Sequence, residues 1–150
     1  MNLDDKYFMG IALKEAEKAL EADEVPVGAL IVDKDGIIIS SGFNTVEKDC
    51  SCIMHAEVKA ILAAQNRLKN WRLDDYSLYV TLEPCVMCCG AIMLSRLSRL
   101  VYAAIDPKGG SSSTILDGKI EIVSCIMEEE SSILLKSFFK SKRGKDRYLR

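Results

Sequence analysis

The sequence is poor in the features that mark membrane and secreted proteins. Its longest run of apolar or small residues, 86–94, spans nine positions, well below the roughly 18 that a membrane-spanning helix needs. The N-terminus carries Asp4 and Asp5, where a secretory signal has basic residues followed by an apolar stretch. We therefore expect a cytoplasmic protein with no membrane segment.

Histidine is also scarce, with one residue, His55, in the whole chain, whereas cysteine is present six times. Because the cytosol is reducing, the cysteines are expected to serve metal binding or catalysis and not to form disulfides. Most of them are also grouped, as ligands usually are: Cys50 lies near Cys52, and Cys85 near Cys88 and Cys89, whereas Cys125 stands apart.

The composition predicts one folded domain over residues 1–150. Apolar residues make up 49% and charged residues 28%, and a chain of this length buries enough surface for a core. The net charge of −2 conceals a basic end, because residues 136–150 hold seven Lys or Arg and one acidic residue. This basic C-terminal helix and tail, about 131–150, is a candidate surface for nucleic acid.

Hydrophobic periodicity and turn residues predict an α/β fold. The expected order is helix, two strands, helix, strand, helix, two strands, helix, with Asp35-Gly36 turning the first hairpin. Strands separated by helices indicate a partly parallel sheet covered on its faces. The helices are expected over 4–22, 55–68, 85–94 and 131–142, and the strands over 27–32, 37–40, 77–82, 99–105 and 120–124.

Three details of that prediction can be checked directly. Pro84 suits the first position of the third helix, because proline lacks the amide hydrogen that goes unused there. Residues 106–113 are rich in glycine and serine and are expected to form a loop. The last helix is expected to turn four apolar residues inward: Ile133, Leu134, Leu135 and Phe138.

Two short segments carry the residues of a metal site. Cys85 and Cys88 share one face at the start of a helix, where unpaired amides and the helix dipole favour thiolates. His55 lies 30 residues earlier, a separation that a helix and a strand can span and reverse. Three protein ligands leave zinc one open position, and a water bound there has its pKa lowered to roughly 7.

Glu57 supplies the proton carrier that such a centre requires. It follows His55 by two residues, so its carboxylate can face the bound water without ligating the metal. Zinc hydroxide would attack an amidine-like carbon while Glu57 passes protons to a ring nitrogen and a leaving amine. The pattern His-x-Glu with Pro-Cys-x-x-Cys is the signature of zinc deaminases.

Other interpretations of these cysteines remain open at this point. Cys85 and Cys88 alone could form a dithiol redox pair or be ordinary core residues. Cys50 and Cys52 could join them in a four-cysteine structural zinc site. Cys89 points about 100° away from Cys88 on a helix and is expected in the core.

Beyond this signature, four stretches closely resemble the bacterial tRNA-specific adenosine deaminases, which convert the wobble adenosine of an anticodon to inosine. The similarity extends from about Phe8 to Phe139. The stretches are Glu-Val-Pro-Val-Gly-Ala at 24–29, Gly-Phe-Asn at 42–44, Leu-Tyr-Val-Thr-Leu-Glu-Pro-Cys at 78–85 and Gly-Ala-Ile at 90–92.

The resemblance implies a three-layer α/β/α sandwich with a five-stranded mixed sheet, as in cytidine deaminases, and a homodimer. It implies one Zn2+ per subunit on His55, Cys85 and Cys88, with Glu57 as the proton shuttle. It also points to substrate contacts at Asn44, Ala56 and Asp106. One segment differs from the family. It consists of residues 114–119 only, whereas members of the family usually have several more residues there.

The resemblance implies that the substrate is a tRNA anticodon stem-loop, whose loop bases are already unpaired. Basic and aromatic residues at the C-terminus could contact its phosphates and stack a base: Lys136, Phe138, Phe139, Lys140, Lys142, Arg143, Lys145, Arg147, Tyr148 and Arg150. Two alternatives stay open: a deaminase of free cytosine, guanine or cytidine with the same centre, and a non-catalytic zinc-containing RNA-binding protein.

Overall fold

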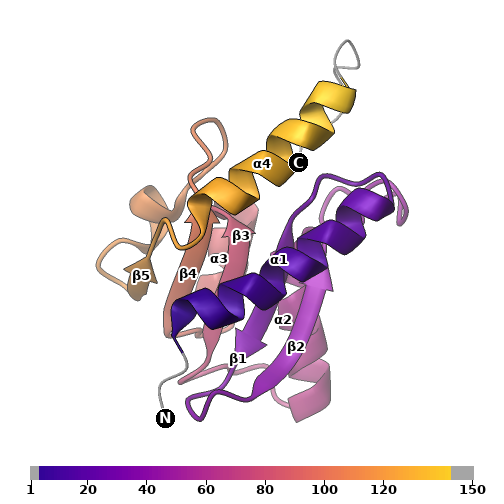
Figure 1. The fold of residues 1–150 in the computed structure, drawn as a ribbon. Helices are drawn as coiled ribbons and strands as arrows, with labels where there is room; N and C mark the ends of the chain where they lie inside the picture. The colour runs from indigo at the N-terminus through magenta and orange to yellow at the C-terminus, as the bar shows by residue number, and fades with distance from the viewer. Residues whose placement is uncertain (1–3, 143–150) are drawn as a thin grey trace.

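The computed structural model describes residues 4–142, and within them the predicted order of elements is confirmed (Figure 1). A short π-helical turn, η1, is added between the last two strands. The elements are α1 (Asp5–Glu21), β1 (Gly28–Val32), β2 (Ile38–Phe43), α2 (Ala56–Leu68), β3 (Ser77–Leu82), α3 (Val86–Leu94), β4 (Arg99–Ala104), η1 (Ser112–Leu116), β5 (Glu121–Val123) and α4 (Glu128–Ser141).

The five strands form one mixed sheet in the order β2-β1-β3-β4-β5. β1 is antiparallel to both of its neighbours, whereas β3, β4 and β5 are parallel. β2 and β3 therefore run in the same direction. The carboxyl ends of β2, β3 and β4 consequently lie at one edge, which we call the carboxyl edge.

Helices cover both faces of the sheet, which confirms the predicted three-layer α/β/α architecture. α1 and α4 lie on one face and α2 and α3 on the other (Figure 1). Along each inner strand, alternate residues enter opposite cores, so Leu30 packs with α1 while Ile31 packs with α2. Both faces of β1 are buried, as expected for a strand covered on two sides.

The first two helices and the hairpin follow the sequence closely. The side chain of Asp4 accepts a hydrogen bond from the Tyr7 amide and caps α1. Asp33 accepts from the amides of Asp35 and Ile37 in the hairpin turn, where Gly36 has a φ of 83°. β2 extends to Phe43, three residues beyond its expected end, because it stays paired with β1.

Several expectations were wrong in detail. α3 begins at Val86 with Cys85 as its N-cap, so Pro84 precedes the helix and does not begin it. α4 begins at Glu128, and only two of its residues, Ser131 and Phe138, are buried. Phe138 is buried, but Ile133 is 59% exposed and not inward. Within residues 4–142, no helix is long and apolar enough to cross a membrane.

Candidate active site

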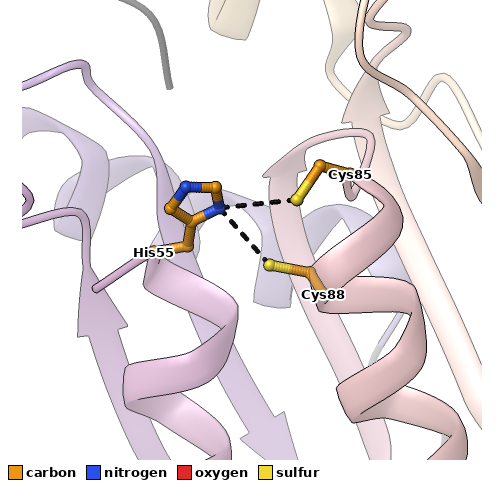
Figure 2. A group of neighbouring side chains, drawn as sticks. All are labelled: His55, Cys85 and Cys88. Atoms are coloured by element: carbon orange, nitrogen blue, oxygen red, sulfur yellow. Dashed lines mark hydrogen bonds between the residues drawn. The ribbon is translucent and has the colours of Figure 1, made fainter. Parts of the chain in front are cut away.

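Two helix N-termini meet at the carboxyl edge of the sheet and bring the metal ligands together. His55 is the N-cap of α2, and Cys85 is the N-cap of α3. Neither side chain caps its own helix, so both are free to point into the space between the helices. Figure 2 shows the histidine ring facing the sulfurs of Cys85 and Cys88 across this space.

The geometry of these three residues suits a metal ion. His55 Nδ1 lies 3.6 Å from the sulfur of Cys85 and 3.5 Å from that of Cys88. All three donor atoms lie within 4.8 Å of one another, and His55 is only 5% exposed. One imidazole nitrogen and two sulfurs form a donor set that zinc prefers, and three donors leave a fourth position open. The residues present therefore fit a catalytic zinc ion.

The local electrostatics prepare one sulfur as a ligand. A hydrogen bond from Cys88 lowers the pKa of the Cys85 thiol to about 3 against the opposing effect of burial, with a smaller lowering contribution from His55. The neighbouring Cys89 behaves in the opposite way, because burial and then the charge of Cys85 raise its pKa to about 12. Cys89 is therefore a core thiol, as expected, and Cys85 a thiolate.

Glu57 lies in the first turn of α2, two residues after His55, and is fully buried. Its negative charge contributes to the raised pKa of the Cys89 thiol on α3. A buried carboxylate beside a metal site is the arrangement required of a proton carrier. Ala56, between these two residues, is also buried and lies at the helix start.

Asn44 follows β2 at the same edge and has an unusual hydrogen-bonding pattern. Its backbone amide donates to the Val27 carbonyl and its side-chain amide to the Val25 carbonyl, at 3.1 and 3.2 Å. Its Oδ1 atom is buried and has no partner among the described residues. Because buried polar atoms are nearly always paired, this acceptor is suited to a ligand.

Asp106 follows β4 at the carboxyl edge and organises its own turn. Its Oδ1 atom accepts hydrogen bonds from the amides of Lys108 and Gly109, each at 3.1 Å. This is the pattern of a turn-forming aspartate. The structure thus gives Asp106 a role in shaping the loop that begins at the end of β4.

Sequence reasoning missed two buried carboxylates that hold the loops of this edge. Glu24 accepts from the amides of Glu47 and Lys48 in the loop before His55, at 3.0 and 2.7 Å. Glu83 makes similar bonds to the loop after β4. The available signal was their position, since each is a glutamate one or two residues before a proline, and glutamate is seldom buried unless paired.

The alternative four-cysteine zinc site is wrong. Cys50 and Cys52 are exposed and do not belong to the His55 group, which is the one potential metal cluster within residues 4–142. Both lie in the loop that precedes His55 and α2, and both side chains face solvent. Cys125 is exposed as well.

The basic end of the chain is only partly as expected. Phe138 is 1% exposed and unavailable for stacking, whereas Phe139 is 42% exposed. Lys142 pairs with Asp23 at 2.6 Å and lies over the Phe138 ring. Five of the predicted contact residues lie outside the described part of the chain: Arg143, Lys145, Arg147, Tyr148 and Arg150.

The fold and the metal-binding residues together define a zinc-dependent deaminase. Residues 2–104 match the cytidine and deoxycytidylate deaminase zinc-binding region. The chain belongs to this family, and zinc is its metal. Family membership supports a zinc-dependent hydrolytic enzyme over the non-catalytic alternative.

Comparison with individual proteins shows which members of the family this chain resembles. The chain is 43% identical to the tRNA-specific adenosine deaminase of Bacillus subtilis strain 168, over 97% of this chain and 95% of that protein. A solved tRNA:A34 deaminase, which performs A-to-I editing at the wobble position, matches with a TM-score of 0.81 and 39% identity, covering 86% and 99% of the two chains. The guanine deaminase of Nitrosomonas europaea shares the fold alone, at a TM-score of 0.83, 24% identity and 92% and 86% coverage. These similarities place the chain among the tRNA-specific adenosine deaminases of the family.

Proposed function

We propose that the protein hydrolyses adenosine to inosine at the wobble position of a tRNA anticodon, as a single deaminase domain. The proposal depends on one observation: the donor atoms of His55, Cys85 and Cys88 lie close together, and the buried Glu57 follows His55 by two residues. Similarity to tRNA-specific adenosine deaminases over nearly the whole length supports the choice of substrate. The reaction consumes adenosine and water and yields inosine and ammonia.

The protein residues divide the chemistry among them. His55, Cys85 and Cys88 would hold zinc, which when bound supplies the Lewis acidity that activates water near neutral pH. Glu57 takes a proton from the attacking water as its oxygen bonds to C6 of adenine. It delivers this proton to ring nitrogen N1, then takes the second proton from the oxygen now bonded to C6 and passes it to the departing amine, so that the C6–N6 bond breaks, ammonia leaves and the C6 carbonyl of inosine forms.

Substrate recognition is assigned to residues of the carboxyl edge. The unpaired Oδ1 of Asn44 is available as an acceptor for a donor group of the nucleoside. Ala56 forms an apolar wall beside the helix start, and the turn organised by Asp106 faces the nucleotides that flank the adenosine. Burial of Glu57 keeps bulk water away from the proton carrier.

The expected partner is an anticodon stem-loop, which presents unpaired bases and so costs little to open. On α4, Lys136 and Lys140 are exposed and flank Phe139, which gives this helix a basic surface with an accessible ring. Such a combination suits single-stranded RNA. A protein that processes tRNA would work in the cytoplasm.

A homodimer is also part of the proposal. The outer surfaces of α2 and α3 expose large apolar side chains, with Leu62 on α2 and Val86 and Leu94 on α3. Exposed apolar side chains on adjacent helices are typical of protein contact surfaces. A second copy of this chain would cover them next to the metal site.

The decisive test compares substrates. The purified zinc protein is incubated with an anticodon stem-loop bearing wobble adenosine, and inosine and ammonia are measured. Free adenosine, cytidine, cytosine and guanine serve as competing substrates, and the same stem-loop with wobble guanosine is the RNA control. Inosine formed in the stem-loop alone is the expected result, whereas turnover confined to the free bases or nucleosides would show that the substrate assignment is wrong.

A further inference from the structure

We propose that Glu83 is a positioning residue that locks the loop of residues 106–112, here called the substrate loop, to the strand end that carries the zinc ligand Cys85. The proposal rests on the proposed function for the identity of the substrate. It assigns a task to a carboxylate that takes no part in the proton transfers.

The Glu83 carboxylate lies between the two segments and is only 6% exposed. One of its oxygens accepts a hydrogen bond from the Asp106 amide at 3.2 Å. The other accepts from the amide and the hydroxyl of Ser112, at 3.3 and 2.6 Å. The carboxylate therefore grips both ends of the substrate loop.

Backbone hydrogen bonds continue the connection on either side of this carboxylate. The Glu83 amide donates to the Ala104 carbonyl at 2.8 Å, and the Ser111 amide donates to the Pro84 carbonyl at 3.0 Å. Pro84 immediately precedes Cys85 in the chain. The substrate loop is thus fastened to the two residues that lead directly into the zinc site.

The loop sequence is adapted to this close approach. A Cβ atom at Gly110 would lie 2.2 Å from a carboxylate oxygen of Glu83 and 2.7 Å from the Asp106 carbonyl oxygen. Only glycine leaves room for the carboxylate at this point. The close contact identifies Gly110 as the complement of Glu83.

The consequence is that the zinc ligand and the substrate loop keep a fixed relative position. A buried carboxylate with three donors forms charge-assisted hydrogen bonds, which are the stronger kind. Weakening them would free the loop and leave His55, Cys85 and Cys88 in place. The loss should therefore appear in binding of the stem-loop and not in zinc content or in the chemical step.

The experiment replaces Glu83 by glutamine, which has the same shape and one acceptor oxygen fewer. Zinc content, thermal unfolding, kcat and KM for the anticodon stem-loop, and hydrogen–deuterium exchange over 106–112 are measured on the zinc protein. We expect KM to rise by about ten-fold or more with kcat within about two-fold and zinc unchanged. Exchange of the loop amides should accelerate.

Matched variants separate this role from a loss of charge or of folding. Glu121→Gln removes a carboxylate that is exposed on β5 and should leave KM and loop exchange unchanged. Ser112→Ala removes the 2.6 Å hydroxyl bond and keeps the amide bonds, so its effect should be smaller and in the same direction. If Glu83→Gln does not fold, Ser112→Ala and Gly110→Ala supply the same comparison of KM, kcat and loop exchange.

Two results would overturn the proposal: unchanged KM and loop exchange in Glu83→Gln, or a fall in kcat together with loss of zinc. A different failure belongs to the proposed function. If the unaltered protein forms no inosine in the stem-loop, the substrate assignment fails. Loop exchange in Glu83→Gln still decides whether Glu83 holds the loop.

Discussion

The two ends of the sheet each carry a polar cluster. The polar groups of one cluster are paired with one another, whereas the other cluster keeps groups that are available to a ligand. At the amino end of β4, the Arg99 guanidinium binds Asp5 through both terminal nitrogens at 2.7 and 2.8 Å, and Glu121 at 2.9 Å. The Tyr79 hydroxyl also donates to Asp5, at 2.7 Å. At the carboxyl edge, by contrast, three donor atoms face one another across a gap and Asn44 keeps an unpaired acceptor.

The pKa shifts express the same difference. The hydrogen bond from Arg99 lowers the pKa of Asp5, the bond to Asp5 raises that of Arg99, and burial together with Asp5 raises that of Tyr79. Every shift favours the protonation state that completes the cluster. The Cys85 thiol is instead shifted toward the form that binds a metal. A cluster that satisfies itself serves stability, whereas one left incomplete serves a ligand.

The largest effect at the carboxyl edge is expected from removing a metal ligand. Cys88→Ala leaves two donors, so we expect zinc binding and deamination to be lost, because a two-ligand site holds zinc poorly. Metal analysis of the purified protein and the inosine assay measure both. Cys52→Ala, which removes an exposed thiol, should retain full zinc and activity. Stoichiometric zinc in Cys88→Ala would contradict the ligand assignment.

The next largest effect is expected at the proton carrier. Glu57→Gln keeps the shape of the side chain but cannot take a proton, so kcat should fall by roughly 10²–10⁴-fold with zinc still bound. Single-turnover inosine formation and metal analysis separate the two properties. Glu47→Gln in the exposed loop is the control. Normal turnover in Glu57→Gln would exclude Glu57 as the shuttle.

A smaller effect should follow from the unpaired acceptor. Asn44→Ala removes Oδ1, and KM for the stem-loop is expected to rise by about ten-fold, the value of one hydrogen bond to substrate. Asn66→Ala, on the exposed side of α2, should have no effect on KM. If kcat/KM is the same in Asn44→Ala and in the unaltered protein, Asn44 is a structural residue.

At the opposite end, a substitution should affect stability and leave catalysis unchanged. Asp5→Asn removes the charge that Arg99 grips, and the free energy of unfolding should fall by about 2 kcal/mol, since both side chains are three-quarters buried. Chemical denaturation measures this, and the inosine assay should show unchanged kcat. Asp74→Asn breaks a similar two-point pair with Arg72 that is exposed, so no measurable change is expected.

The same pair predicts a dependence on pH. The pKa of Asp5 is lower in the folded protein than in the unfolded chain, so its contribution is complete above the unfolded value of about 3.9. As the pH falls below that value, the unfolded chain takes up the proton first and the stabilisation is lost. As the pH is lowered, the free energy of unfolding should therefore fall less in Asp5→Asn than in the unaltered protein. If the free energy of unfolding falls equally with pH in both proteins, this prediction is wrong.

The sequence was sufficient for the parts of the protein that depend on short spacing. Cys85 and Cys88 lie one helical turn apart, and Glu57 lies two residues from His55, so the ligand set and its carboxylate were predictable. Strand alternation and turn residues similarly predicted the sheet. These features are local, and the fold needs only to bring two helix starts together.

The remaining features depend on contacts between distant residues. Glu83 meets Ser112 across 29 positions and Glu24 meets Lys48 across 24, and no local pattern records either pair. Ile133 and Phe138 are five residues apart, about 140° round a helix, so the burial of Phe138 turns Ile133 outward. Pro84 was assigned to the helix start because its chemistry fits there, but Cys85 occupies the cap.

The use of the only histidine as a ligand makes the site easy to follow by spectroscopy. His55 is the sole imidazole in the chain, and its Nδ1 faces both sulfurs (Figure 2). A nuclear magnetic resonance spectrum of the untagged protein therefore contains a single imidazole ring. Metal occupancy, ring tautomer and exchange between loaded and empty forms can all be followed in that one spin system without any resonance assignment by mutation.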